Sequence, residues 1–471
     1  MKFTILSHAG MLVESQGISL MTDPWLVGSC YWRSWWNYPK AADFATRLEK
    51  LDYIYLTHMH WDHYHGPSLR KLPKQATVLV PQAHLDRMSK DLRQCGRDKF
   101  VEIPHGKTLQ LGNGLSVTSY QFGLCLDSVL IVTDGKTTLA DMNDCKMTGL
   151  PLRQILRRHP KVDFMLRSHS SASPYPYCVH AEDPGELSYR NNEHFIQDFV
   201  LTAQLLKARY AVPFASNHCF LHKDTYPFNS TVVTPTEVEE YFARQVPEGP
   251  KCMVMLPGDS WSDEDGFRIT KEDYFSDREQ RLAEYAAEKA PILEKQYQKE
   301  EAARLEFAPF EKYFQRFMDS LPWFSRLVFK PVVVFRQSNR PDVWWIVDFN
   351  RRKVYESAEL PADYSFSISM STAVLKDCIF RRMFATFTPS KRLSIELRRG
   401  RVKDLMFFLQ LIDMYEYDYF PLVPMAFKPR FVKNWARRWR EVLMLNGMIL
   451  QALRKVVRRT DPLGSFVAKV R

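Results

Sequence analysis

The sequence predicts an α/β protein in which one large layered domain is followed by a smaller α+β unit. Short apolar runs typical of buried strands alternate with helix-like segments over residues 1–262, as in layered α/β domains. From residue 263 the chain becomes charge-rich, and strand and helix patterns return after residue 324. Hydrophobic residues make up 45% and charged residues 25% of the 471 positions, which excludes a disordered or fibrous chain.

The first domain is expected to begin with a β-hairpin. Residues 2–7, 11–14 and 18–22 have strand character and surround a turn at Gln16 and Gly17. Residues 51–57 form an apolar, aromatic run suited to a buried strand, and a helix is expected at 68–72. Further strands are expected at 77–81, 115–122, 128–133, 137–139, 161–167, 211–213 and 251–256, with a helix at 192–208 and a two-residue turn at Asp134 and Gly135.

Three further segments complete the expected organisation. Residues 263–324 form a charged helical segment, residues 325–425 a small α+β domain, and residues 426–471 a basic amphipathic C-terminal helix. Within the α+β domain, strands are expected at 331–336, 344–349, 365–369 and 393–397, and a helix is expected at 402–413.

The most informative stretch follows the strand at 51–57 and reads Thr57-His58-Met59-His60-Trp61-Asp62-His63-Tyr64-His65-Gly66. Four potential metal ligands occupy six positions where a buried strand turns into a loop: His58, His60, Asp62 and His63. Two histidines separated by one residue can reach one metal ion if the loop bends, while the aspartate and third histidine serve a neighbouring ion. Neutral imidazoles and a carboxylate are ligands for zinc, iron or manganese.

This stretch resembles the signature of the metallo-β-lactamase superfamily, in which the pattern H-x-H-x-D-H follows a hydrophobic strand. Other segments agree with the resemblance in the expected order: Ser7-His8-Ala9-Gly10, Met21-Thr22-Asp23-Pro24-Trp25-Leu26, Asn143-Asp144-Cys145, and Ala211-Val212-Pro213 followed by His218. The resemblance implies a four-layer αββα fold over residues 1–262, with the later segments as a helical and α+β extension.

Within the superfamily, the chain looks most like the part of the cytidine-monophosphate sialic acid hydroxylases that follows their Rieske domain. The residues that carry this likeness are Met21 to Leu26, Tyr53 to His60, Asp127-Ser128, Asn143 to Cys145 and Ser171 to Pro174, with a weaker likeness from Ile346 to Phe349. Because the hairpin begins at residue 2, no Rieske domain is expected ahead of it.

The resemblance implies two divalent metal ions, either zinc or iron. His58 and His60 would bind the first ion. Asp62, His63 and His218 would bind the second, and Asp144 would bridge the two, with Asp141 as an alternative bridge. Such a pair lowers the pKa of a shared water toward about 7, and the same ligand types hold two irons that activate dioxygen. Asp62, Asp144 and His169 are the residues expected to act in catalysis.

One departure from the superfamily concerns the third histidine of the first ion, which normally follows the strand at 115–122. This sequence has Tyr120-Gln121-Phe122-Gly123 there. Either Gln121 ligates weakly, or the position is open, or only one ion is held tightly. His169 is a substitute ligand or a residue that contacts substrate or another ligand, while His105 lies at the wrong end of the strand. His8 and Asp23 are expected to orient loops and ligands.

Two short motifs, Cys178-Val179-His180 and Cys219-Phe220-Leu221-His222, together spell the C-x-H and C-x-x-H pattern of a Rieske cluster. The 38 residues between His180 and Cys219 are more than a Rieske pair is expected to have. Coincidence is therefore the preferred interpretation, and an extra iron or zinc centre is the alternative.

Aromatic residues crowd the stretch after Asp23 and Pro24: Trp25, Tyr31, Trp32, Trp35, Trp36 and Tyr38. A loop at this position can overhang the metal site and form a pocket wall for a ring or an acyl chain. An aromatic lid packed on the domain core is the preferred alternative, and the two are compatible.

The net charge of +11 is concentrated at the C-terminus. Residues 428–471 hold twelve Lys and Arg against Glu441 and Asp461, so the preceding residues sum to only +1. Phe431, Trp435 and Trp439 recur at helical spacing among the basic residues, as in a basic amphipathic helix. Such a helix binds an anionic membrane surface, recruits an acidic substrate or packs on the protein body, and nucleic acid ranks below these partners.

The expected compartment is the cytoplasm, with peripheral membrane contact through the basic helix as an option. The eight cysteines are dispersed, no secretory signal is visible, and no apolar run reaches the roughly 18–20 residues that span a bilayer. The oligomeric state is left open.

The leading functional hypothesis is a dinuclear metal-dependent hydrolase. Metal-bound hydroxide would attack an ester, phosphodiester or amide of a small, anionic, phosphate-bearing or lipid-like substrate. The alternative is an iron-dependent oxygenase acting on a sugar-nucleotide-like molecule. A third hypothesis is a non-catalytic binding protein that retains the fold.

Overall fold

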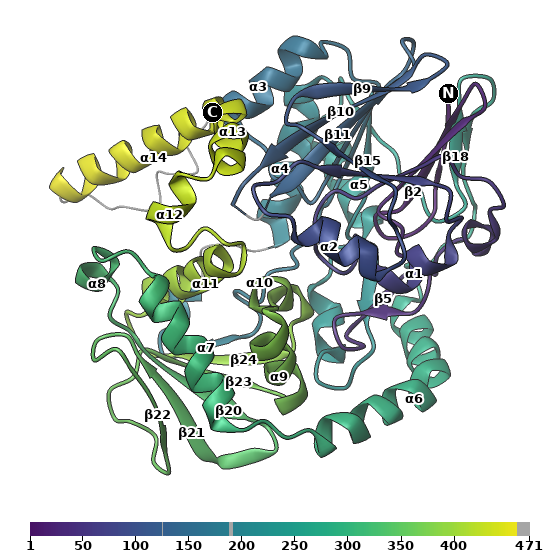
Figure 1. Cartoon of the computed structure of the whole chain (residues 1–471). Coiled ribbons are helices and arrows are strands. Elements are labelled where there is room, and N and C mark those ends of the chain that lie inside the picture. The colour runs from purple at the N-terminus through teal and green to yellow at the C-terminus, as the bar shows by residue number, and fades with distance from the viewer. Residues whose placement is uncertain (125, 188–191, 459–471) are drawn as a thin grey trace.

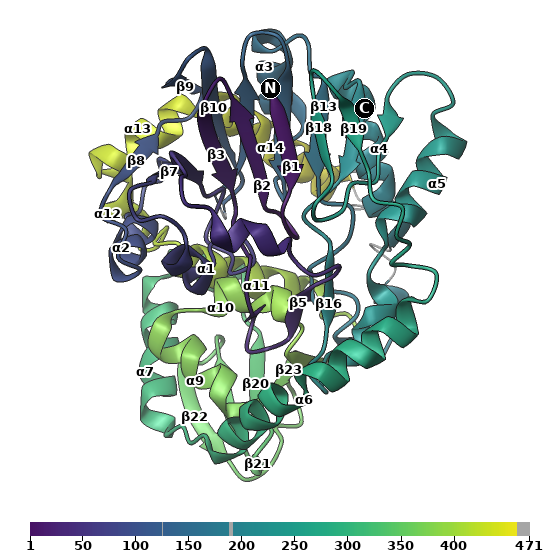
Figure 2. The same ribbon diagram turned by 90° about the vertical axis from the view of Figure 1, so that its right-hand side faces the viewer.

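The computed structural model describes residues 1–124, 126–187 and 192–458, with side chains in the last range up to residue 448. Two sheets packed face to face form the core of the N-terminal part, and a third sheet with its own helices forms the lower part of Figures 1 and 2. The predicted α/β class is confirmed.

The first sheet has the strand order β19-β18-β1-β2-β3-β6-β7-β8. Its strands are β1 (Lys2–Ile5), β2 (Met11–Ser15), β3 (Ile18–Thr22), β6 (Tyr53–Tyr55), β7 (Thr77–Pro81), β8 (Phe100–Ile103), β18 (Ser260–Ser262) and β19 (Gly266–Arg268). Strands β3, β6, β7 and β8 run parallel, so their carboxyl ends meet at one edge of the sheet. The loops that follow β3 and β6 carry Asp23 and the histidine motif to that edge.

The second sheet has the order β17-β15-β13-β12-β11-β10-β9. Its strands are β9 (Lys107–Gly112), β10 (Leu115–Phe122), β11 (Asp127–Thr133), β12 (Thr138–Asn143), β13 (Phe164–Arg167), β15 (Tyr210–Pro213) and β17 (Lys251–Cys252). A strand was expected to run to residue 256, but only Lys251 and Cys252 pair with β15.

Helices cover the outer face of each sheet, which completes the predicted αββα arrangement (Figure 2). Helices α1 (Gly66–Lys71) and α2 (Arg87–Gln94) pack on the first sheet, and α3 (Gly149–Arg158), α4 (Asn192–Leu206) and α5 (Pro235–Gln245) pack on the second. Residues such as Phe3, Leu79 and Phe164 fill the space between the sheets. Burial at about 25 cal/mol per Å² of apolar surface stabilises these layers.

The third sheet belongs to the C-terminal part and has the order β14-β24-β23-β20-β21-β22. Its strands are β14 (Val179–Ala181), β20 (Val332–Gln337), β21 (Arg340–Asp348), β22 (Lys353–Ser357), β23 (Phe366–Met370) and β24 (Leu393–Leu397). Strand β14 comes from the middle of the N-terminal part and pairs with β24, so the two parts interlock.

Helices of the C-terminal part are α6 (Arg278–Ala302), α7 (Phe307–Ser320), α8 (Ser325–Val328), α9 (Thr372–Arg381), α10 (Phe384–Phe387) and α11 (Val402–Glu416). Helix α6 runs along the lower edge of the molecule in Figure 1 and passes through Pro291 without ending. Pro291 lies on the exposed face of that helix.

Short elements link the parts. The small sheet has the order β16-β5-β4, with strands β4 (Ser29–Cys30), β5 (Trp35–Asn37) and β16 (His218–Phe220). In the part of the chain that the structure describes, 3₁₀ helices lie at η1 (Asp43–Arg47), η2 (Pro184–Leu187), η3 (Tyr226–Thr231) and η4 (Thr388–Ser390).

Up to residue 458 the C-terminal segment forms helices α12 (Leu422–Ala426), α13 (Pro429–Arg437) and α14 (Trp439–Arg458). Residues 459–471 of the expected basic helix lie outside the described residues. The segment up to residue 458 closes over two loops of the N-terminal part, because Asn434 Nδ2 donates to Gln82 O at 2.6 Å and Arg438 Nη2 donates to Gly123 O at 2.7 Å. Within the described residues, no helix combines the length and apolarity needed to cross a membrane.

Candidate metal centre

Loops from both sheets converge on the predicted site. The loop after β6 carries His58, His60, Asp62 and His63, the end of β12 leads to Asp144, and β1 leads to His8. Three neighbouring residues of these loops adopt positive φ: Asp23 at 36°, Asn143 at 52° and Ala215 at 51°. Strained backbone of this kind persists only where surrounding contacts hold it in place, and such positions cluster at functional sites.

Asp23 is the buried anchor of the loops. It accepts hydrogen bonds from Thr57 N at 2.8 Å, from Thr57 Oγ1 at 2.6 Å and from Asn143 Nδ2 at 2.7 Å. Its Oδ2 also lies 2.8 Å from His63 Nδ1. One carboxylate therefore fixes the start of the histidine loop, a potential ligand and the strand end before Asp144.

The first ligand group consists of His58, His60 and Asp144, whose ligand atoms lie within 4.8 Å of one another. His58 Nε2 and His60 Nδ1 are 2.8 Å apart. Burial lowers the pKa of both histidines to about 4, and each is lowered further by a neighbouring histidine. Both imidazoles are therefore neutral at pH 7, which is the form that binds a metal.

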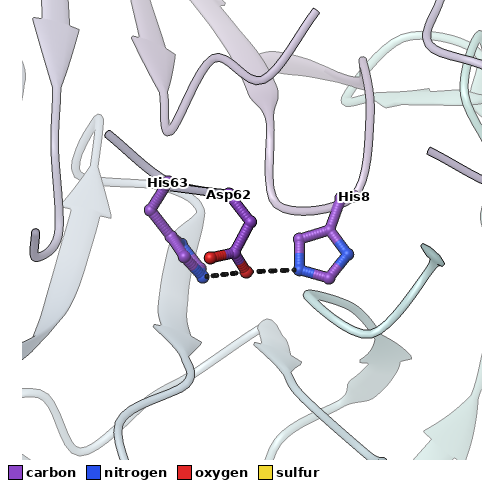
Figure 3. Close-up of side chains that lie close together, drawn as sticks. All are labelled: His8, Asp62 and His63. Atoms are coloured by element: carbon purple, nitrogen blue, oxygen red, sulfur yellow. Dashed lines mark ion pairs between the residues drawn. The ribbon is translucent and has the colours of Figure 1, made fainter. Parts of the chain in front are cut away.

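The second ligand group consists of His8, Asp62 and His63, again within 4.8 Å, and is drawn in Figure 3. Asp62 Oδ2 lies 3.1 Å from His8 Nε2 and 3.2 Å from His63 Nε2. Burial opposes the charge of Asp62, but His63 and His8 hold its pKa well below the usual range. Burial likewise opposes the charge of His63, yet Asp62 and Asp23 raise its pKa well above the usual value.

Asp144 joins the two groups. Its carboxylate groups with His58 and His60 of the first group. Its Oδ2 also lies 3.2 Å from Nε2 of His63, which belongs to the second group. Although burial acts in the opposite direction, His63 lowers the pKa of Asp144. The position between both groups is the one that a bridging carboxylate requires.

His218 lies beside the second group, stacked flat on Trp35 with ring centroids 3.6 Å apart. Its ring centroid is 5.5 Å from that of His8. Both ring nitrogens are buried and have no hydrogen-bond partner within the described residues. The sequence predicted that His8 orients loops and ligands and that His218 is a ligand of the second ion. In the structure, the residue whose ring nitrogen groups with the ligand atoms of Asp62 and His63 is His8.

The chemistry of these donors is compatible with bound metal ions. Buried polar atoms are normally hydrogen-bonded, and an unpaired one calls for an explanation such as an ion. The ring nitrogens of His218 and Nδ1 of His8 are unpaired within the described residues. Imidazoles and carboxylates at this spacing suit zinc, iron or manganese.

The alternative ligands lie outside both groups. Gln121 Nε2 donates to Ile103 O, and the Gln121 backbone N donates to His105 Nδ1, so these two residues contact each other instead of the histidine loop. His169 Nε2 lies 3.2 Å from Val233 O, and burial lowers its pKa to about 3. Asp141 is fully buried, and burial together with nearby Asp23 raises its pKa.

Asp127 is a site residue that the sequence reasoning did not single out as a ligand. Asp127 begins β11, which pairs antiparallel with β12, and Asp144 directly follows the end of β12 at the same edge of the sheet. The Asp127 Oδ1 is buried and unpaired within the described residues. Burial raises the pKa of Asp127, and the charge of nearby His60 opposes that rise. The available sequence signal was an aspartate at the start of a strand.

Two cations also lie beside Asp144. Lys146 Nζ donates to Ser168 Oγ, and burial and Arg167 together lower the Lys146 pKa to about 8. Arg167 is 3% exposed, and its Nε and Nη1 have no partner within the described residues. A buried, incompletely paired guanidinium is suited to a carboxylate or phosphate group.

The aromatic segment packs on the core and also supports the second group. Tyr31 Oη donates to Asp62 Oδ1 at 2.5 Å, and Trp35 stacks on His218. Tyr31, Trp32 and Arg33 all have positive φ, between 52° and 66°. Trp32 Nε1 donates to Asp377 Oδ2 of the C-terminal part at 2.8 Å, which helps to hold this strained turn.

The four residues of the Rieske-like pattern do not converge. Cys178 is buried in the core of the C-terminal part, whereas Cys219 is buried in a separate cluster with Trp36. His222 groups instead with Asp224 and Glu300. Arg392 binds both of those carboxylates, at 3.2 and 2.5 Å, so that group is an ion-pair network.

A family model named beta-lactamase superfamily domain matches residues 2–163, which include the histidine loop and Asp144. This part of the chain is therefore similar to a beta-lactamase superfamily domain. The superfamily resemblance inferred from the sequence is thereby confirmed for this region.

Curated relatives extend beyond the matched domain. A putative Rieske 2Fe-2S iron–sulfur protein from Mycobacterium tuberculosis is 26% identical over 322 residues, 62% of this chain and 61% of the relative. The chain thus spans about three fifths of that relative. Cytidine monophosphate-N-acetylneuraminic acid hydroxylase from Asterias rubens is 36% identical over 75 residues, 16% of this chain and 12% of the relative.

Two solved structures match the chain at lower sequence identity. Igni18, a metallo hydrolase from Ignicoccus hospitalis, has a TM-score of 0.40 at 17% identity and covers 55% of this chain and 96% of its own. CmlA, a diiron beta-hydroxylase from Streptomyces venezuelae, has a TM-score of 0.38 at 16% identity and covers 54% and 52%.

Proposed function

We propose that this chain is a two-metal hydrolase of the metallo-β-lactamase superfamily acting on an ester, phosphodiester or amide with a nearby anionic group. The observation that carries the proposal is the junction of the two ligand groups, where His63 Nε2 lies 3.2 Å from both Asp62 Oδ2 and Asp144 Oδ2. Bound metal ions would supply a Lewis acid and a water of lowered pKa.

The chain's own residues have distinct roles in this proposal. His58, His60, Asp127 and Asp144 would hold the first ion, and Asp62, His63 and either His8 or His218 would hold the second. Asp23 orients His63 through Nδ1, and Tyr31 orients Asp62, so the ligands are fixed before an ion binds. His169 would act only indirectly, since its Nε2 faces a backbone carbonyl.

Lys146 and Arg167 supply the preference for an anionic substrate. Both lie within electrostatic range of Asp144, and Arg167 keeps two nitrogens without a partner in the described residues. A phosphate or carboxylate bound there would be positioned next to the metal pair, and its negative charge would be balanced.

An iron-dependent oxygenase is the second candidate. The observation in its favour is the carboxylate of Asp127 beside His60, because a first site with two imidazoles and carboxylates suits iron as well as zinc. Two curated relatives are named as a Rieske iron–sulfur protein and a hydroxylase, which supports the same candidate.

The decisive experiment is elemental analysis of protein purified without added metal, combined with assays on p-nitrophenyl esters and bis(p-nitrophenyl) phosphate with and without oxygen. We expect two ions per chain and oxygen-independent turnover. His60→Ala should lose one ion and about 10³-fold in rate. His65→Gln is the matched control, because His65 lies in the same loop but pairs with Ser68 Oγ.

Each alternative has its own outcome. Two irons with oxygen-dependent turnover would replace the hydrolase by the oxygenase. A protein without tightly bound metal, whose cellular activity is unchanged by His60→Ala, would instead be a binding protein that retains the fold.

A further inference from the structure

Helix α8 carries an exposed apolar tip that no packing partner within the described residues covers. Trp323 is 71% exposed and Val328 is 83% exposed, and Phe324 and Leu327 are exposed between them. The flanking residues Leu321 and Phe329 are buried in the C-terminal core, so the tip is held out by a packed base. Large apolar side chains gathered in this way mark interaction surfaces.

A second exposed apolar group lies on the C-terminal helices. Phe427 is 80% exposed, and Val423, Val432, Trp439 and Leu443 are exposed as well. Their neighbours Phe431 and Trp435 pack against Tyr419 instead. The amphipathic segment therefore uses one face to dock on the protein and leaves other apolar side chains in solvent. Helices α8, α12 and α14 all project toward the left side of the molecule in Figure 1.

Positive charge accompanies both groups. Residues 321–341 contain Arg326, Lys330, Arg336 and Arg340 but no acidic residue. Residues 419–440 contain six Lys and Arg and again no acidic residue. Three of those six are engaged within the protein. Arg430 pairs with Glu102, Arg438 pairs with Glu441, and Arg437 Nη1 donates to Gln82 Oε1 at 2.5 Å. Lys428 and Lys433 are exposed, and Arg440 lies over the Trp439 ring at 4.3 Å.

We propose that the α8 tip and the α12–α14 helices form a docking surface for an anionic lipid bilayer. Apolar tips beside unopposed cations match the interface of such a bilayer, where acyl chains accept Trp, Leu and Val and headgroups attract Lys and Arg. Tryptophan in particular favours the headgroup level, and Trp323 and Trp439 are both exposed. This surface is separate from the metal ligands, so the inference stands independently of the proposed hydrolase activity.

The docking surface also contacts the loop that follows β10. Glu441 Oε1 of α14 accepts a hydrogen bond from Gly123 N at 2.9 Å, and Tyr419 Oη donates to Leu124 O at 3.0 Å. That loop leads directly to Asp127.

The test is cosedimentation of the full chain with phosphatidylcholine vesicles that contain or lack 30% phosphatidylglycerol. We expect binding to the anionic vesicles only, weakened by 0.5 M NaCl because salt screens the headgroup charge. Leu327→Ser combined with Val328→Ser should lower vesicle binding at least about 10-fold, because it removes two apolar side chains that would insert into the bilayer interface. Lys428→Glu with Lys433→Glu should weaken binding to anionic vesicles as well.

The matched control is Leu201→Ser with Leu205→Ser, because these α4 side chains are also exposed, at 46% and 45%, but lie outside the docking surface. Thermal unfolding of every variant checks that it folds. If one variant misfolds, another exposed apolar residue of the docking surface can be changed instead. Equal binding to both vesicle types, or unchanged binding of the α8 and charge variants, would overturn the proposal. Self-association that the α8 variant abolishes, without vesicle binding, would assign the surface to a protein interface instead.

Discussion

The two ligand groups differ in burial and in what holds them. In the second group, His8, Asp62 and His63 are each at most 2% exposed, and Tyr31, Asp23 and Trp35 enclose them. In the first group, His60 and Asp144 are only partly buried. His58 contacts Thr57 and His60, and its ring centroid lies 4.2 Å from that of His63. The contrast indicates a rigid inner site and a more accessible outer one, where substrate would exchange with solvent.

The largest effect should come from Asp23, because it supports both groups at once. Asp23→Ala leaves Thr57 N, Asn143 Nδ2 and His63 Nδ1 without their acceptor in a buried setting. We expect a loss of about 3–5 kcal/mol in unfolding free energy, measured by urea denaturation, and metal content below one ion per chain.

Asp52→Ala is the control for this change, since Asp52 accepts from Ser19 N and Oγ on the same sheet but is partly exposed. It should cost only about 1 kcal/mol and leave the metal content unchanged. A similar loss in both variants would mean that Asp23 has no special role at the site.

The order of metal release tests the contrast directly. A chelator should remove the ion of the accessible first group at least about 10-fold faster than the ion of the buried second group, because exchange requires the ligands to open to solvent. Stopped-flow release into a colorimetric zinc chelator would then be biphasic with equal amplitudes. A single phase would show that the two sites open together.

Variants of Asp127 and Gln121 test which of the two is the additional ligand of the first ion, beside His58, His60 and Asp144. Asp127→Asn keeps the volume but removes the charge, so we expect metal affinity at the first site to fall about 10–100-fold while the second ion is retained. Gln121→Leu is the matched change at the residue that the sequence offered as a weak alternative ligand, and it should leave both affinities unaltered. Titration calorimetry of the metal-free variants measures each step. The reverse ranking would identify Gln121 as the ligand.

The sequence was most informative where the site is local. His58, His60, Asp62 and His63 lie within six positions, so their proximity follows from the chain itself. Asp144 and Asp23 could be expected only from the superfamily resemblance, because the strand ends that bring them together are far apart in sequence. The helix that packs through Phe431 and Trp435 was visible as an amphipathic pattern, whereas its division into α13 and α14 was not.

Residues whose role depends on register could not be found in this way. Asp127 approaches Asp144 only because β11 and β12 pair with Leu130 opposite Asp141. Lys146 and Arg167 are ordinary basic residues in the sequence, and their burial beside Asp144 depends on how β12 and β13 lie in parallel. His218 stacks on Trp35, a contact between distant segments that no sequence pattern encodes.

The smallest expected effect concerns His84, a buried histidine that lies outside both ligand groups. His84 is buried like the site histidines, but its Nε2 lies 2.7 Å from Tyr417 O and its ring packs against Tyr419 and Phe431. Burial lowers its pKa to about 4, while the Tyr417 carbonyl opposes that shift. Its unfolded pKa is about 6.5, so below that pH the unfolded chain binds more protons and the folded state loses stability.

We therefore expect metal-free protein to lose about 1–2 kcal/mol through His84 between pH 7 and pH 5, and His84→Gln to lack that part of the pH dependence. Urea denaturation at the two pH values measures the difference. His159→Gln is the control, because His159 is less buried and pairs with Tyr120 Oη. If both variants kept the full pH dependence of the unfolding free energy, the acid sensitivity would have to come from histidines of the two ligand groups instead of His84.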